Sequence, residues 1–306
     1  MTVIEYKYPS SDVPSAGRAI ALGFFDGVHI GHRALLSECV RTAREEGLVP
    51  TVLTFPTEAM RIKSSAPRLY STEEKLRLFE ECGILQTIVV DFDSVSSLSP
   101  EDFVTRVLVC DLGARVALAG ENYRFGHRAA GDAELLSRLM ARSGGRASIH
   151  NMEVCSLEGE EITVSSTVIR EHLARCDVKT AAALLGAPYR IHGKVVHGNG
   201  VGTSFGFPTV NTDIPATSPI GRGVYRTELV ANGKTYTALT NVGTCPTFGE
   251  RAMHAETFIP GFSGDLYGED IELRFLEFIR GEREFPSTEA LAEEIRRNID
   301  HITKGR

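Results

Sequence analysis

The first half of the chain alternates between short apolar runs and segments with helical periodicity. The apolar runs have the length of buried parallel strands and lie at residues 18–22, 51–55, 87–92 and 115–119. Between them, residues 34–46 show helical spacing, a capping-box pattern starts a second helix at Ser71, and Ser99 ahead of Pro100 starts a third. This alternation predicts an α/β fold with a parallel sheet. Ligands bind beyond the carboxyl ends of such strands, so the loops after the first, second and fourth runs are the candidate sites.

The pattern changes to β-like near residue 187. A helical stretch over residues 179–185 ends at Gly186, and the short β-like runs that follow lie at residues 191–196, 223–231, 235–242, 256–259 and 271–279. The dipeptide Asn232-Gly233 between two of these runs predicts a tight hairpin. Residues 287–302 have a strong helical pattern. The second half is therefore predicted to be a small antiparallel β-barrel with a terminal helix.

Composition narrows the class of protein. The chain has 306 residues, enough for two domains, with 42% hydrophobic and 24% charged residues, as in a soluble globular protein. Its net charge is −7 and it has no long run of Lys and Arg, so we expect no nucleic-acid partner. Glu5 and Lys7 interrupt any apolar leader, and the apolar run at residues 19–25 is too short to span a membrane. Six scattered cysteines without a CxxC pair favour free thiols and a cytoplasmic protein with no membrane partner.

The loop after the first apolar run carries a candidate phosphate site. Its sequence is GFFDGVHIGH at residues 23–32, with His29 and His32 three positions apart where a helix begins. Backbone N–H groups at a helix start attract phosphate, and imidazoles there can donate to a phosphoryl oxygen as charge builds on it. Gly27 and Gly31 permit close approach of the backbone to a ligand. The alternative is a capped helix start with two surface histidines.

A run of hydroxyl side chains could complete this site. Ser165, Ser166 and Thr167 lead into a helical segment that carries Arg170 one turn later. Hydroxyls, helix N–H groups and a guanidinium together form a clamp for polyphosphate. The same string can also be an ordinary N-cap followed by a solvated arginine.

The loop after the fourth apolar run offers polar and aromatic groups on the same sheet edge. It reads GENYRFG, in which Asn122 could bind phosphate, and Tyr123 and Phe125 could stack on a planar ring. Alternatively, the two aromatic rings simply pack the loop.

These three motifs, GFFDGVHIGH, GENYRFG and VSSTVIR, together resemble the nucleotidylyl-transferase module of bacterial riboflavin kinase/FAD synthetases over about residues 15–186. The resemblance implies a Rossmann-like domain over residues 1–186 that adenylylates FMN with ATP. It implies that His29 and His32 are catalytic and that Tyr123 and Phe125 bind the flavin. The candidate ATP-binding residues of this domain are Gly23, Phe24, Asp26, Gly31, Asn122, Ser165, Ser166, Thr167 and Arg170.

The β-rich half carries a second candidate phosphate site. A glycine-rich stretch at residues 193–200 is followed by GFPTVN at residues 206–211. Thr209 offers a hydroxyl to Mg²⁺, which prefers oxygen ligands, and Asn211 can orient that shell. Glu256 could accept a proton from an alcohol, or it could be an exposed strand carboxylate with no role. Neither a Walker A motif nor GxGxxG is present in this half.

GFPTVN, together with the GVY and DLYG segments, resembles the riboflavin kinase domain over about residues 187–306. The resemblance implies that Thr209 and Asn211 hold Mg²⁺ with ATP and that Glu256 is the base. Further candidate ATP-binding residues are Gly193, Gly206 and Pro208. The whole chain would then be a bifunctional enzyme with riboflavin, FMN and ATP as substrates.

Several residues depart from the family's usual pattern. Thr57-Glu58-Ala59 replaces a Pro-His-Pro loop, Thr203 and Cys245 stand where arginine is usual, and Phe258 replaces a histidine. Two other functions are therefore open. The chain could be a riboflavin kinase whose adenylylating module has degenerated, or a flavin-binding regulator with neither activity.

Overall fold

In the computed structural model the described residues are 1–9, 13–57, 66–151, 153–157, 159–196, 207–244 and 253–304. The chain divides into two compact units, Met1–Ser166 and Thr167–Arg306. This division falls before the expected domain boundary at residue 186, so compactness groups two short helices with the second unit. Within the described ranges, every helix is too short or too polar to traverse a lipid bilayer.

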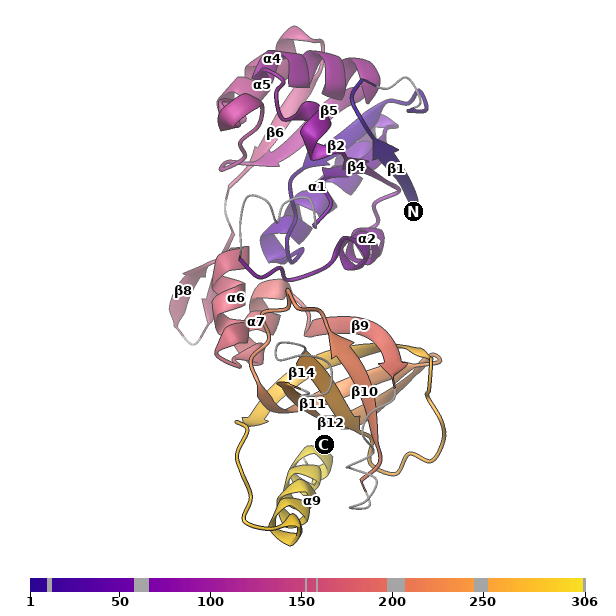
Figure 1. Ribbon diagram of the computed structural model, residues 1–306. Coiled ribbons are helices and arrows are strands. Elements are labelled where there is room, and N and C mark those ends of the chain that lie inside the picture. Colours follow the sequence, from indigo (N-terminus) through magenta and orange to yellow (C-terminus); the bar gives the residue numbers. More distant parts are fainter. Residues whose placement is uncertain are drawn as a thin grey trace. The chain divides into compact units, whose positions relative to one another are not determined.

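The first unit is built on a six-stranded sheet in the order β1-β4-β3-β2-β5-β6, and every pair in it is parallel (Figure 1). Its strands are β1 Thr2–Tyr6, β2 Arg18–Leu22, β3 Val49–Thr54, β4 Gln86–Val90, β5 Ala114–Gly120 and β6 Arg146–His150. The parallel sheet and its four central strands confirm the prediction. The edge strands β1 and β6 were not predicted.

The helices of this unit cover both faces of the sheet. They are α1 Ile30–Glu46, α2 Thr72–Glu81, α3 Phe92–Val95, α4 Pro100–Asp102, the π-helix η2 Phe103–Asp111, the 3₁₀ turn η3 His127–Ala129 and α5 Ala133–Arg142. Helix α1 packs on β2 and β3, while η2 and α5 pack on β5. A hairpin of β7 Val154–Leu157 and β8 Glu160–Thr163 follows the sheet.

Side-chain caps fix where these helices begin, as the sequence predicted. The hydroxyl of Ser71 accepts a hydrogen bond from the N–H of Glu74 at the start of α2. Ser99 does the same for Asp102 at the start of α4, with Pro100 at the first helical position. Each cap satisfies an N–H group that the helix itself leaves unpaired.

The order of the strands fixes where a ligand can bind. Strands β3 and β5 flank β2 on opposite sides, so the chain changes direction across the sheet at β2. The loops after β2, β3 and β5 therefore share one carboxyl edge at the switch point, where open α/β sheets bind ligands. All five residues of β2 are buried, so this edge rests on a rigid centre.

The second unit is a closed barrel in the order β10-β13-β12-β11-β14-β9, and every pair is antiparallel (Figure 1). Its strands are β9 Tyr189–Val196, β10 Thr209–Ile214, β11 Gly223–Ala231, β12 Lys234–Thr244, β13 Met253–Phe258 and β14 Asp270–Arg280. The predicted barrel is confirmed, and so is the Asn232-Gly233 hairpin, whose residues have φ of 50° and 72°. Strand β10 was not among the predicted β-like runs.

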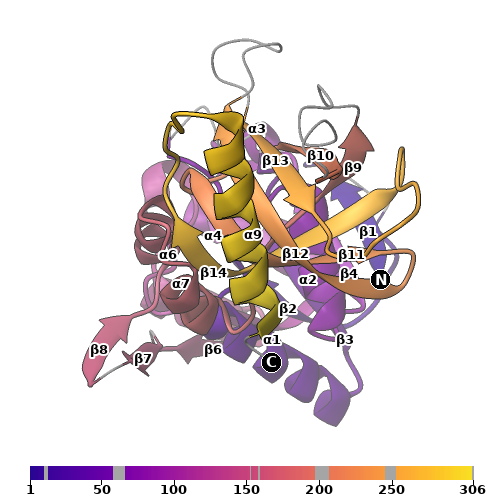
Figure 2. The same ribbon diagram turned by 90° about the horizontal axis from the view of Figure 1, so that it is seen from below.

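Among the residues that the structure describes, three helices accompany the barrel: α6 Ser166–Ala174, α7 Val178–Leu185 and α9 Thr288–Lys304. Helix α7 ends at the left-handed Gly186, as predicted. The terminal helix α9 lies on the barrel beside β12 (Figure 2). Its Ile302 is fully buried with Val224 and Leu239 of the barrel, so an apolar contact holds it there.

Hydroxyl groups form a ladder inside the barrel. The side chains of Thr227, Thr240 and Thr257 come from three adjacent strands and are at most 1% exposed. The oxygen of Thr240 lies 2.7 Å from that of Thr227 and 2.9 Å from that of Thr257. The three hydroxyls thus satisfy one another inside the barrel.

Candidate active sites in the two units

The loop between β2 and α1 has a strained backbone that hydrogen bonds hold in place. Phe25 and Val28 have φ of 55° and 42°, in the left-handed region that side chains with a β-carbon disfavour. A carboxyl oxygen of Asp26 accepts from the N–H of Leu69 at 3.0 Å. The carbonyl of Phe24 accepts from the Thr54 hydroxyl at 3.0 Å. Strain of this kind persists where surrounding contacts over-determine the backbone, which is common at functional sites.

The histidines of this loop lie face to face at the start of α1. The rings of His29 and His32 are stacked with centroids 3.6 Å apart and an interplanar angle of 17°. His29 is only 8% exposed and His32 is partly exposed, so the alternative of two surface histidines is wrong for His29. Its side chain accepts from the N–H of His32, so it also caps the helix. That acceptor is Nδ1, which places the proton of the neutral ring on Nε2.

Burial keeps both imidazoles neutral. It lowers the pKa of His29 from 6.5 to about 4. The pKa of His32 lies well below the usual value because of burial, the neighbouring His29 and the cation of Lys75. Nδ1 of His32 is buried and has no hydrogen-bond partner among the described residues. A neutral pair with an unused polar atom suits the reception of an anionic group at the helix start.

The glycines of the loop are close-packed. A β-carbon on Gly31 would lie 3.3 Å from Glu153 and 3.5 Å from the His29 ring. One on Gly23 would lie 3.0 Å from the Phe25 ring. The absence of a side chain at both positions therefore lets the histidine loop fold tightly on itself.

The hydroxyl segment joins this loop in part. The Ser166 hydroxyl donates to the Asp26 carbonyl at 2.7 Å, which brings two sequence motifs 140 residues apart into contact. Ser165 directly precedes α6. Thr167 and Arg170 belong to the second compact unit, and there the Arg170 guanidinium donates to the Thr167 hydroxyl at 2.9 Å.

The aromatic loop after β5 places one side chain in the core and leaves others accessible at the carboxyl edge of the sheet. Phe125 is 5% exposed, and its ring lies 5.8 Å from that of Phe103 in the core and 5.7 Å from that of Tyr123. Tyr123 is partly exposed and Asn122 is exposed. Phe125 therefore packs the loop, as the alternative interpretation had it, while Tyr123 and Asn122 remain accessible to a ligand.

The segment Thr57-Glu58-Ala59 after β3 departs from the family's usual sequence, and its first residue, Thr57, is among the described residues. Thr57 is 4% exposed, with its N–H donating to the Thr72 hydroxyl at 2.8 Å and its own hydroxyl donating to the Tyr70 carbonyl at 3.3 Å. Glu58 and Ala59 lie outside the described residues. Thr57 therefore anchors the loop to the start of α2 and does not point to a ligand.

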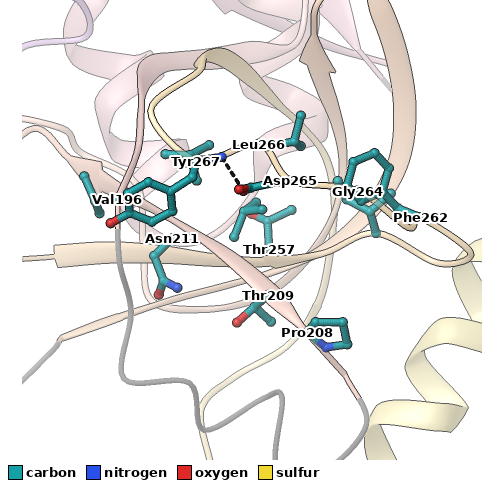
Figure 3. A pocket seen from close by; sticks show the side chains of 13 residues that line it. Val196, Pro208, Thr209, Asn211, Thr257, Phe262, Gly264, Asp265, Leu266 and Tyr267 are labelled. Atoms are coloured by element: carbon teal, nitrogen blue, oxygen red, sulfur yellow. Dashed lines mark hydrogen bonds between the residues drawn. The ribbon is translucent and has the colours of Figure 1, made fainter.

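In the barrel unit, a pocket of about 260 Å³ opens beside the start of β10 (Figure 3). Pro208, Thr209 and Asn211 line one side, and the loop between β13 and β14 provides the other with Asp265 and Tyr267. The Thr209 hydroxyl and the Asn211 amide lie on the same side of β10 (Figure 3). An Asp265 carboxyl oxygen accepts from the N–H of Tyr267 at 2.8 Å, which shapes that loop.

The predicted base is one strand away from this pocket. Glu256 pairs in register with Asn211 on β10 and with Asn241 on β12. Directly paired residues share a face, with β-carbons about 5 Å apart. Glu256 is exposed, whereas its neighbours Ala255 and Thr257 point into the barrel. The outer face of the barrel thus carries a row of amide, carboxylate and amide.

Sequence reasoning missed Asn241 as a member of this row. Only the strand register shows that it flanks Glu256. Lys75, the buried cation beside the histidine loop, was missed as well. It sits in a helical pattern that looks like any amphipathic helix.

The glycines and the proline that the sequence predicted to bind ATP in this unit lie in different places. Pro208 lines the pocket. Gly193 lies within β9, where a β-carbon would come 2.6 Å from Cγ2 of Thr212, so close packing between strands explains it. Gly206, like Thr203 and Cys245, lies outside the described residues.

The oxygen groups at the start of β10 fit a magnesium ion. The parts of the chain that the structure describes hold no cluster of three or more His, Cys, Asp or Glu side chains suited to a metal. Mg²⁺ does not require such a cluster, because it keeps several waters and takes one or two protein oxygens beside substrate phosphates. Thr209 and Asn211 present that kind of donor at the pocket.

Comparison with known proteins assigns both units to a class. The FAD synthetase family model matches residues 13–168, and the riboflavin kinase family model matches residues 185–305. The two matches together define the class: a transferase of flavin cofactors with two parts, the sheet unit that carries the histidine loop and the barrel unit that carries the polar face.

Relatives along the whole chain narrow this class to a family. Those named bifunctional riboflavin kinase/FMN adenylyltransferase include a protein of Escherichia coli K12, 33% identical over 97% of this chain and 96% of its own. Another, from Buchnera aphidicola, is 30% identical over 95% and 94%. The chain belongs to the family of bifunctional riboflavin kinase/FMN adenylyltransferases, which confirms the resemblance seen in the sequence.

A solved structure shares the fold. A crystal structure described as a macrolide-efflux protein from Streptococcus pneumoniae is 27% identical and covers 100% of both chains with a TM-score of 0.86. A solved protein therefore also combines a sheet unit and a barrel unit in one chain.

Proposed function

We propose that the chain uses ATP twice on one small substrate. The barrel unit phosphorylates riboflavin to FMN, and the sheet unit adenylylates FMN to FAD with release of pyrophosphate. The observation that carries this proposal is the presence of two chemically different polar sites in separate units: a neutral histidine pair at a helix start, and an exposed carboxylate between two amides. Family membership supports both steps.

In the kinase step, Glu256 takes the proton from the ribityl 5′-hydroxyl of riboflavin. The hydroxyl oxygen forms a bond to the γ-phosphorus of ATP, the bond from that phosphorus to the β-γ bridging oxygen breaks, and ADP leaves. A bound Mg²⁺ neutralises charge on the phosphates in such reactions, and Thr209 and Asn211 would hold it. The pairing of Asn211 with Glu256 supports this, because it sets the base beside the proposed metal ligand.

In the adenylyl step, an oxygen of the FMN phosphate attacks the α-phosphorus of a second ATP, and pyrophosphate leaves. The nucleophile is already an anion, so no protein base is required. The imidazoles of His29 and His32 donate hydrogen bonds to the α-phosphate as its charge rises. Their position at the start of α1 supports this role, because the helix N–H groups point the same way.

Further residues position the substrates of the adenylyl step. Asn122, Ser165, Ser166, Thr167 and Arg170 hold the triphosphate. Gly23, Phe24, Asp26 and Gly31 form the loop around it. Tyr123 stacks on the flavin, and Phe125 supports the Tyr123 ring from the core. The stacked arrangement of Tyr123 on Phe125 supports this division of roles, because it leaves one ring accessible and the other buried.

Separation of flavins after incubation with ATP and Mg²⁺ tests the proposal. Starting from riboflavin, the protein should form FMN and then FAD, and starting from FMN it should form FAD. Glu256→Gln should abolish FMN formation and leave the conversion of FMN to FAD intact. His29→Ala combined with His32→Ala should do the reverse. The two-site assignment is wrong if either variant, while folded, loses both steps equally, and a chain that makes neither product overturns the function itself.

A further inference from the structure

Lys75 is a buried cation that the adenylyl mechanism above does not use. It lies near the start of α2 and its side chain is fully buried. The start of a helix carries a partial positive charge, and burial removes a cation from water, so both features disfavour an ammonium group at this position. The neighbouring acidic residues Glu73 and Glu74 are the type that a helix start favours. A lysine in this place therefore requires a compensating role.

The Lys75 ammonium connects two loops at the carboxyl edge of the sheet. It donates to the Phe24 carbonyl at 3.0 Å, the Phe55 carbonyl at 3.0 Å and the Thr54 hydroxyl at 3.4 Å. Phe24 belongs to the histidine loop after β2, and the other two acceptors lie where β3 ends. One side chain thus fixes the spacing between the two loops.

The bond to Phe24 also orients the backbone of the histidine loop. The Phe24 carbonyl receives hydrogen bonds from both Lys75 and Thr54. Because a trans peptide points its C=O and the following N–H in opposite directions, this fixes the N–H of Phe25 to point away from Lys75. A backbone N–H that is held in one direction at such a turn is the kind of group that binds phosphate.

The charge of Lys75 reaches the histidine pair. Its cation acts on His32 in the direction that keeps this imidazole neutral, as does the neighbouring His29. The ammonium lies 4.3 Å from the centre of the Phe24 ring, and the Arg68 guanidinium lies 5.2 Å from the same ring. The Glu153 side chain also lies near this loop, with its Cγ 3.3 Å from the position that a β-carbon on Gly31 would take.

We propose that Lys75 is a positioning residue for adenylyl transfer, holding the Phe24 peptide so that the histidine loop presents its N–H groups and neutral imidazoles to the ATP phosphates. The proposal rests on the adenylylating function assigned to the first unit. It assigns Lys75 no contact with a substrate. Its effect passes through the Phe24 carbonyl and through the electric field at His32.

Kinetics of FMN-to-FAD conversion across a range of pH tests this role. Lys75→Met removes the charge and the donors while keeping the length of the chain. Thr54→Val is the matched control, because it removes the other donor to the Phe24 carbonyl and leaves the charge. We expect Lys75→Met to lower kcat for FAD formation by about tenfold or more, which is less than the roughly 100- to 1000-fold for losing a donor that contacts the developing charge itself, because Lys75 acts through the Phe24 carbonyl. The rate of riboflavin phosphorylation by the same variants should be unchanged. This rate is the control that the variant chains are folded.

The pH profile separates positioning from simple support of the fold. Without the Lys75 cation, the pKa of His32 should rise. The acid limb of the pH profile, which is the fall in the rate of FAD formation at low pH, should therefore move to higher pH. Lys75→Arg should keep the limb of the unmodified protein, and so should Thr54→Val. If Lys75→Met fails to fold, Lys75→Gln replaces it, since an amide can still donate to a carbonyl without carrying charge.

Two outcomes would overturn the proposal. One is a neutral Lys75 variant whose kcat and acid limb match those of the unmodified protein. The other is a Thr54→Val chain that shifts the limb as much as Lys75→Met does, which would mean that the charge is irrelevant. An unmodified chain that makes no FAD from FMN would instead refute the adenylylating function on which the proposal rests.

Discussion

The neutral histidine pair at the start of α1 makes the stability of the first unit depend on pH. The pKa of His29 is lowered from 6.5 to about 4, so between these values the unfolded chain binds more protons than the folded chain. Stability therefore falls as the pH falls through this window. This pKa shift lowers the free energy of unfolding by about 3 kcal/mol once the pH is below both values. About 2 kcal/mol of this decrease occurs between pH 7 and pH 5. The pKa of His32 is lowered in the same direction, so it adds to this loss.

Hydrogen exchange of the full-length protein measures this effect in each unit separately. Peptides from β2 and β5 report on the first unit and peptides from β11 and β12 on the barrel. After correction for intrinsic exchange rates, protection of the sheet peptides should fall between pH 7 and pH 5 by at least the amount given above for His29. In a chain with His29→Asn and His32→Asn, most of this fall should vanish, because asparagine also caps helices but does not titrate. The same loss of sheet protection in both chains would refute the assignment of buried neutral imidazoles.

Two substitutions test the packing of the barrel, each measured as a change in the free energy of unfolding in urea. Gly193→Ala should destabilise the barrel by about 1–3 kcal/mol, because its β-carbon would meet Cγ2 of Thr212 at 2.6 Å. Adding Thr212→Ser removes that methyl group and should restore much of the stability; no recovery would count against a packing role for this glycine. Thr240→Val should cost about 1–3 kcal/mol, since it deprives the hydroxyls of Thr227 and Thr257 of a partner. An unchanged free energy of unfolding would show that the ladder does not stabilise the barrel.

The sequence predicts well those strands that are buried on both faces or end at a recognisable turn. Strand β2 is buried on both faces, so its apolar run marks the bounds Arg18–Leu22. Strand β11 ends at the Asn232-Gly233 turn, whose residues tolerate a left-handed backbone. The edge strand β1 is mostly exposed, and β6 has the sequence RASIH, so neither contains an apolar run. Strand β10 was missed because Thr212 places a polar residue on the inner face between Val210 and Ile214, which hides the apolar/polar alternation.

The candidate sites divide in the same way. Motif order along an α/β chain predicts which loops share the carboxyl edge, and the bond from Ser166 to the Asp26 carbonyl agrees with that placement. The stacking of His29 on His32 could not be predicted, because it depends on the backbone path through the left-handed Phe25 and Val28. In the barrel, the row through Glu256 depends on strand register, and a shift of one residue would turn its side chain inward.

The two proposed sites differ because their nucleophiles differ. An alcohol must lose a proton as it attacks, and the barrel offers an exposed carboxylate for this, with Asn211 and Asn241 beside it. A phosphate attacks as an anion, so no group is needed there to take a proton from it. The sheet instead offers neutral rings, helix N–H groups and a buried cation behind them, all of which suit accumulating negative charge. Each unit thus has the charge that its own step requires, which explains why one chain keeps two unrelated folds for two uses of ATP.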